Sequence, residues 1–203
     1  LVAPSVHNDR IDPRTRRKLF TCYRTWRRRG LCVLELFCAF LSRRKTHPVL
    51  LVRSDTDAPM WISSQESVQL AVGECEFTCC ETNHVGHDGT LSMDCSKSVA
   101  KRVLNRLIDA KIRDLLERES VVASRMFTVL RHFWIRGLEK EENPSKPNLS
   151  QLRTLLNWSE THDELWVDRE GVSILTYAAT IDSVEAVREV LKEFQDQNLD
   201  PPT

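Results

Sequence analysis

Residues 23–54, YRTWRRRGLCVLELFCAFLSRRKTHPVLLVRS, decide the fold of this chain. Residues 31–41 are apolar except for Glu35, and their side chains would cover all sides of a helix. We therefore expect a helix that is buried on more than one face. The short apolar run at residues 49–52 predicts a central strand of a parallel sheet. A helix followed by such a strand is half of a βαβ unit, whose first strand we expect to be missing from this chain.

Composition limits the classes of protein that this chain can belong to. It has 203 residues, 41% of them hydrophobic and 29% charged, which suits one large or two small soluble domains. Residues 1–29 hold nine Lys/Arg against two Asp, a charge of +7. Residues 160–203 hold three Lys/Arg against eleven Asp/Glu, a charge of −8. The total charge is zero, which argues against nucleic acid as a partner.

The chain shows no targeting or membrane signal. No run reaches the roughly 18 apolar residues of a membrane span. The sequence begins at Leu1 rather than Met, and we expect it to be a fragment. It has seven cysteines and no visible secretory signal, so we expect reduced thiols and a cytoplasmic location.

The fold class predicted from these patterns is a helix-rich α/β protein in four parts. Residues 1–95 form an α/β module with a Cys-rich loop. Residues 96–138 show apolar positions at helical spacing on both sides of a break, which predicts a helical hairpin ending at Gly137. Residues 139–148 contain two prolines and predict a linker. Residues 149–203 begin with a short helix and continue as a second helical pair.

Residues 168–194, DREGVSILTYAATIDSVEAVREVLKEF, resemble an ankyrin repeat, with two short helices and a tight turn at residues 181–183. The matching positions are Asp168, Gly171, Ser173, Leu175, Ala178, Ala179, Val184, Glu185, Val187, Val190 and Leu191. The segment departs from the family at Ile174, where Pro is usual, and at Thr176, where His is usual. The resemblance implies neighbouring repeats and a surface for a protein partner. The alternative is a generic helical hairpin.

Residues 29–36, RGLCVLEL, resemble the Trp-Cys-x-x-Glu-Leu motif of TIR domains, with Leu31 where Trp is usual. The resemblance implies a flavodoxin-like sheet and NAD as a substrate. It also implies that Glu35 is the catalytic carboxylate, which would hold the nicotinamide ribose and stabilise an oxocarbenium-like transition state. Burial among neighbouring apolar residues would raise the pKa of such an acid. The alternative is a buried carboxylate paired with Arg28, Arg29 or Arg43 in an adaptor without activity.

The order of segments along the chain carries a further resemblance. Residues 71–80, AVGECEFTCC, follow the basic and apolar stretch and precede the helical hairpin and the ankyrin-like segment. This arrangement is similar to that of large ankyrin-repeat proteins of dinoflagellate-type algae. The similarity implies no particular activity.

Residues 75–95 concentrate side chains that bind soft metals, in the pattern C-x3-C-C-x3-H-x2-H-x7-C. A structural zinc ion takes four cysteine or histidine ligands in a tetrahedron. We therefore predict a zinc site whose ligands come from the set Cys75, Cys79, Cys80, His84 and Cys95, with His87 also nearby. The spacing is not that of a standard finger, and neighbouring cysteines would point in opposite directions in a strand. The alternative is ordinary buried cysteines beside a surface loop.

No phosphate-binding glycine loop, nucleophile elbow or metalloprotease motif is present, so the common enzyme classes that use them are excluded. The leading functional prediction is a signalling scaffold that binds proteins through ankyrin repeats. One alternative is a hydrolase that cleaves NAD with Glu35. The other is a zinc-dependent regulatory module.

Overall fold

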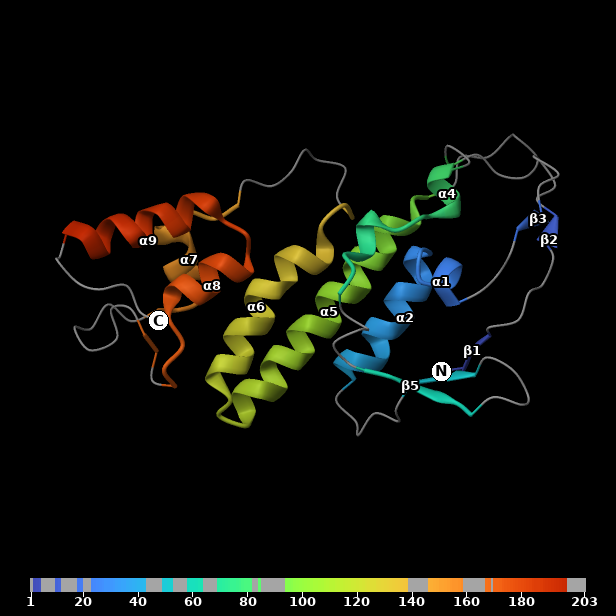
Figure 1. The fold of residues 1–203 in the computed structure, drawn as a ribbon, viewed down its shortest axis with the longest axis horizontal. Coiled ribbons are helices and arrows are strands. Elements are labelled where there is room, and N and C mark those ends of the chain that lie inside the picture. Colours follow the sequence, from blue (N-terminus) through green and yellow to red (C-terminus); the bar gives the residue numbers. More distant parts are fainter. Residues whose placement is uncertain are drawn as a thin grey trace. The chain divides into compact units, whose positions relative to one another are not determined.

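The computed structural model describes residues 2–4, 10–11, 18–19, 23–42, 49–52, 58–63, 69–81, 84, 94–138, 146–158, 167–168 and 170–196. In these residues the fold is rich in helix with little sheet, as predicted (Figure 1). The chain divides into two compact units, residues 1–107 with 134–140 and residues 108–133 with 141–203. The division falls inside the hairpin predicted at residues 96–138, so each unit contains part of both of its helices.

The sheet of the first unit has three short strands in the order β1-β4-β5. Strand β1 (Val2–Pro4) lies parallel to β4 (Val49–Val52), and helix α2 (Gly30–Leu41) lies between them in the chain. These elements form a βαβ unit. The expectation that its first strand is missing from this chain was therefore wrong. A three-residue strand is too short to show a period in the sequence, and its partner lies far along the chain.

The flavodoxin-like sheet is not shown by the described residues. Strand β5 (Met60–Ile62) pairs antiparallel with β4, so β4 has a parallel neighbour on one side only. Residues 49 and 51 of β4 are buried, whereas Leu50 and Val52 remain half-buried. The apolar run is the central strand of its sheet, as predicted, but this sheet is small and mixed rather than parallel. The other short elements here are β2 (Arg10–Ile11), β3 (Lys18–Leu19) and α1 (Tyr23–Trp26).

Helix α2 packs its apolar face into the core of the first unit. Val33, Leu36, Phe37 and Leu41 are buried, at the spacing expected for one side of a helix. Leu36 shares a cluster with Val49, Leu51, Ile62 and Trp26.

Residues 71–81 follow β5 in the chain and pack against the start of α2. They contain η1 (Val72–Glu74) and α4 (Thr78–Glu81). The N–H of Gly30 donates to the carbonyl of Glu76 at 2.9 Å, and the N–H of Glu76 donates to the carbonyl of Arg28 at 2.7 Å. Phe77 is buried directly against Gly30, where a Cβ would lie 2.1 Å from the aromatic ring. Only glycine therefore fits at the start of α2.

The same segment is fixed to the ends of the two long helices, α5 (Ser96–Glu117) and α6 (Val121–Ile135). Gly73 packs against the backbone of Gly137, so closely that a Cβ on Gly73 would lie 2.1 Å from the Gly137 carbonyl carbon. The Lys97 ammonium donates to the carbonyls of Gly73 at 2.8 Å and Gly137 at 2.9 Å. Gly137 has a φ of +76° and follows the last turn of α6, which confirms the predicted helix stop.

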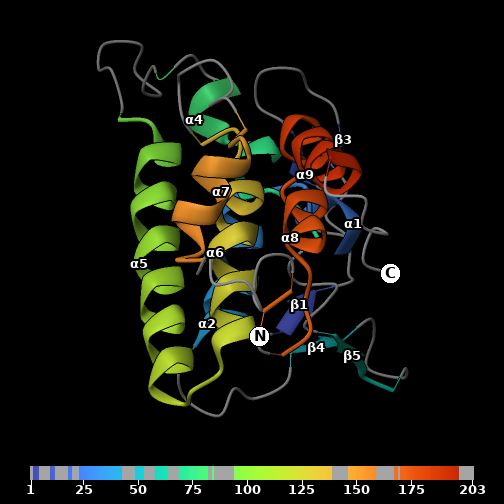
Figure 2. The ribbon, with the colours of Figure 1, turned by 90° about the vertical axis from the view of Figure 1, so that its left-hand side faces the viewer.

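The second unit contains α7 (Leu149–Leu155), α8 (Ile174–Thr180) and α9 (Val184–Asp196). Helices α8 and α9 lie side by side, joined by a tight turn at residues 181–183, as predicted (Figure 2). The Ser173 hydroxyl caps α8, and the Ser183 hydroxyl accepts from the N–H of Ala186 at the start of α9. Residues 139–145 of the predicted linker lie outside the described residues, and residues 146–148 lead directly into α7.

One buried carboxylate, Asp168, organises the polar contacts inside the second unit. It accepts hydrogen bonds from Arg125 Nη1 at 3.2 Å and from the Tyr177 hydroxyl at 3.0 Å. It also accepts from the backbone N–H of Val172 at 2.9 Å and of Glu170 at 3.2 Å. Burial and the neighbouring Asp168 raise the pKa of Tyr177, so its hydroxyl stays a donor. The Asp168 carboxylate therefore has hydrogen-bond donors on both of its oxygens within an apolar core.

None of the helices in the described ranges is both long enough and apolar enough to cross a lipid bilayer.

Candidate metal centre

Four of the five predicted ligands converge in the first unit. Cys79 and Cys80 lie on α4, His84 follows it, and Cys95 immediately precedes α5. One donor atom from each residue lies within 4.8 Å of the others. The fifth, Cys75, is not part of this group, because its thiol donates to the Ala71 carbonyl at 3.5 Å instead.

The distances within this group fit one tetrahedral ion. Cys80 Sγ lies 3.9 Å from Cys79 Sγ, 3.8 Å from Cys95 Sγ and 3.7 Å from His84 Nε2. Zinc bonds of about 2.3 Å to sulfur and 2.0–2.1 Å to nitrogen give tetrahedral edges of about 3.8 Å and 3.6 Å. The three distances from Cys80 are therefore those expected between ligands of one zinc ion, and the donor atoms of all four residues lie within 4.8 Å of one another.

The local backbone explains how two neighbouring cysteines reach the same point. Cys79 and Cys80 were expected to diverge if they lay in a strand, but they lie in a helix, where successive side chains are about 100° apart. The chain then turns back at His84, which has a φ of +60° and whose N–H donates to the Cys79 carbonyl at 2.7 Å. This turn brings the imidazole to Cys80.

Helix α5 supplies positive potential to the cluster. The N–H of Ser96, in the first turn of α5, points at Cys79 Sγ at 3.3 Å. Helix N-termini favour thiolates for this reason. Burial alone would raise the pKa of Cys79, but the hydrogen bonds from Ser96, Cys80 and Cys95 together outweigh it and lower that pKa. Burial and the neighbouring Cys95 and Cys79 raise the pKa of Cys80 to about 11, so this thiol holds a proton that a metal would displace.

Glu35 lies elsewhere, on the exposed face of α2. The expected burial is therefore wrong, because the neighbouring Leu36 and Phe37 turn inward and leave Glu35 towards solvent. Within the described ranges no ion pair joins Glu35 to Arg28 or Arg29, and Arg43 lies outside them. The catalytic role of Glu35 stays a prediction. His87 also lies outside the described residues.

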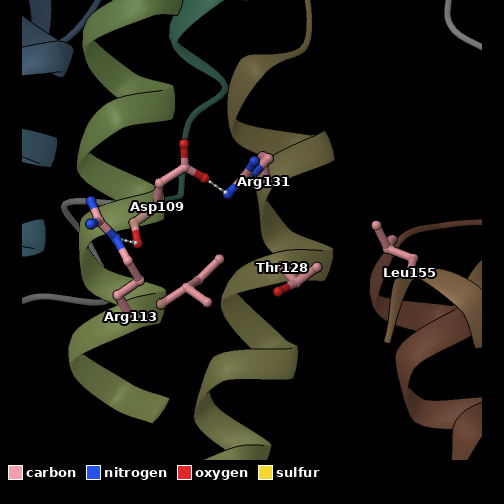
Figure 3. Close-up of a pocket in the computed structure, with 6 residues that line it drawn as sticks. Asp109, Arg113, Thr128, Arg131 and Leu155 are labelled. Atoms are coloured by element: carbon pink, nitrogen blue, oxygen red, sulfur yellow. Dashed lines mark hydrogen bonds and ion pairs between the residues drawn. The ribbon is translucent and has the colours of Figure 1, made fainter. Parts of the chain in front are cut away.

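A surface groove of about 590 Å³ lies in the second unit, lined by residues of α5, α6 and α7 (Figure 3). Its charged groups are engaged with each other: Arg131 pairs with the Asp109 carboxylate, and Arg113 Nε donates to the Asp109 carbonyl at 3.4 Å. Thr128 and Leu155 lie farther along the groove (Figure 3). Ligand sites usually present free polar groups that converge on one point. The groove shows no such convergence, and we assign no ligand to it.

Two residues that matter for these sites were not singled out from the sequence. Lys97 is an ordinary lysine in a helical pattern, and nothing in the sequence marks its contacts with Gly73 and Gly137. Arg125 lies 43 positions from Asp168, and no sequence pattern indicates the contact between them.

Comparison with known proteins finds no matching family model, no matching curated protein and no matching solved structure.

Proposed function

We propose that the first unit is a zinc-binding module in which Cys79, Cys80, His84 and Cys95 hold one ion. The observation that carries this proposal is the convergence of three thiols and one imidazole at tetrahedral spacing. Soft sulfur ligands with one imidazole suit zinc better than magnesium or calcium, which prefer oxygen.

The role of the ion in this proposal is structural. Catalytic zinc sites use three protein ligands and leave a position for water, whereas structural sites fill all four. Here four protein side chains are available. The ion would join the end of α4 to the start of α5, beside the backbone contacts that Lys97 makes with Gly73 and Gly137. It would therefore hold residues 71–81 against the N-terminus of α5.

Metal analysis of the reduced chain tests this proposal. We expect about one zinc per chain after gel filtration, because the site offers one complete ligand set. Cobalt in place of zinc should give the intense visible absorption of a tetrahedral thiolate site. Trace zinc in folded protein whose thiols all react as free groups would remove the proposal.

We also propose that the second unit binds a protein partner through an ankyrin-like surface. The support is the order of a loop with Gly171 at φ +84°, two short helices and a tight turn between them. Helix α9 exposes Val184 at 56% and Leu191 at 38%, one above the other on the same face. Exposed aliphatic side chains on one helix face suit contact with another protein.

The βαβ order of β1, α2 and β4 supports the TIR-like resemblance of the first unit.

Paired variants test the partner surface. We expect Val184→Glu with Leu191→Glu to remove a partner that the wild-type chain captures, while circular dichroism shows unchanged helix content, because both side chains are solvent-exposed. Glu185→Gln, which alters a neighbouring exposed residue of the same helix, is the control. Equal capture by all three chains would exclude this face.

A further inference from the structure

We propose that the metal site is a reversible redox switch, in which peroxide joins Cys80 to Cys95 and releases the zinc ion. This inference rests on the proposed zinc function. It concerns the regulation of the same site and identifies which two ligands leave together.

The geometry selects the Cys80–Cys95 pair. Their sulfur atoms are 3.8 Å apart, and the residues are 15 positions apart in the chain. A disulfide needs about 2.05 Å, so the sulfurs have to approach by about 1.8 Å. Cysteines that are not neighbours in the chain can adopt the geometry of a disulfide without the strain of a small ring.

The third thiol is a poorer candidate. Cys79 and Cys80 are neighbours in the chain, and a bond between them would close a small, strained ring. Cys79 is also buried, and it accepts the N–H of Ser96 at the start of α5. Cys80 and Cys95 are only half-buried, so a molecule as small as peroxide can reach them. Cys79 is therefore the thiol that we expect to stay outside the disulfide.

The chemistry balances with hydrogen peroxide as the oxidant. One thiolate attacks a peroxide oxygen, the O–O bond breaks, and a sulfenic acid and a hydroxide form. The second thiolate attacks the sulfenic sulfur, the S–S bond forms and a second hydroxide leaves. Each thiolate gives up one electron, peroxide accepts two, and the buffer supplies the two protons that convert both hydroxides to water. Cys79 and His84 then remain as two ligands, too few to retain zinc.

The cysteines outside the cluster lack a partner for this reaction within the described residues. Cys38 is exposed on α2, and Cys75 donates to the carbonyl of Ala71. Cys32 is half-buried on the same helix as Cys38. The metal cluster is therefore the place where disulfide formation is expected.

Peroxide titration of the zinc-loaded, full-length chain tests the switch. We expect loss of about one zinc per chain, detected with a chromophoric chelator, together with a mass decrease of two hydrogens. Dithiothreitol with added zinc should restore both values. Cleavage after glutamate isolates residues 77–81 from Cys75 and Cys95, and fragmentation of the linked peptide between Cys79 and Cys80 identifies which of the two is bonded to Cys95.

Cys95→His removes the disulfide partner and offers an imidazole in place of the thiol, and its zinc content is measured before peroxide is added. The fraction of that bound zinc that peroxide releases should be smaller than in the wild type. The matched control is Cys38→Ser, which changes a thiol outside the cluster and should behave as the wild type does. Equal zinc loss from Cys95→His, or a disulfide at other cysteines, would overturn the switch. Zinc that stays bound in oxidised wild type overturns it too, whereas a reduced chain without zinc overturns the proposed function itself.

Discussion

Cys80→Ser is expected to abolish zinc binding and to unfold the first unit at temperatures where the wild type is folded. The Cys80 sulfur lies within 3.9 Å of the donor atoms of Cys79, His84 and Cys95, so it contacts every other ligand of the set. Serine has nearly the same size, so the change removes a ligand without removing volume. A three-ligand remnant should lose most of its affinity.

The stability effect follows from the strength of structural zinc sites. Zinc-finger peptides gain about 10–16 kcal/mol from their metal at neutral pH. Whole domains are stable by only about 5–15 kcal/mol, so the loss of even half of that binding energy is decisive. The effect should be largest at residues 71–81 and at the first turn of α5, because the ligands lie in these two segments.

Three measurements check this expectation: zinc content, thermal unfolding by circular dichroism, and amide exchange of residues 71–81. Cys75→Ser is the matched control, because it changes the same residue type five positions earlier, outside the cluster. Its zinc content and transition temperature should equal those of the wild type. If chelator-treated and zinc-loaded wild type unfold at the same temperature, the ion does not stabilise the unit.

Asp168→Ala is expected to destabilise the second unit by about 3–5 kcal/mol, the usual cost of breaking a buried ion pair by removing one partner. The Arg125 side chain is only 15% exposed, and it would lose the carboxylate that it pairs with. The buried Tyr177 hydroxyl would lose its acceptor as well. Two backbone N–H groups in the loop before α8 would also lose theirs.

Chemical denaturation measures this cost. Asp182→Asn is the control: Asp182 pairs with Lys146 at the surface with its side chain 74% exposed, and such pairs contribute at most about 1 kcal/mol. Asparagine also tolerates the positive φ at that position. A double-mutant cycle with Arg125→Met should show coupling between Arg125 and Asp168. Equal denaturation midpoints for Asp168→Ala and Asp182→Asn would mean that the buried contacts of Asp168 do not stabilise the unit.

The metal site shows which features a sequence reveals. Residue type and density pointed to the cysteines and the histidine, and four of the five candidates do converge. The sequence could not separate Cys75 from Cys79, because that distinction depends on whether the backbone is helix or strand. The short helix α4 and the turn at His84 decide it.

Non-local pairing accounts for most of the differences in the fold. The pairing of β1 with β4 joins segments nearly 50 residues apart, and three residues carry no readable period. The contact between Arg125 and Asp168 has the same origin. By contrast, the helices at residues 96–138 and 174–196 rest on local apolar spacing and turn residues, and they were predicted correctly.

The start of α5 makes three different attachments through three consecutive residues. Cys95 faces the metal cluster, the N–H of Ser96 points at Cys79, and Lys97 reaches two glycine carbonyls. Each residue of a helix turns the next by about 100°, so an insertion or deletion here would rotate everything that follows. Ala100 and Leu104, which are fully buried, would then face solvent. This tripeptide therefore sets the rotation of the helix about its own axis, relative to the metal cluster.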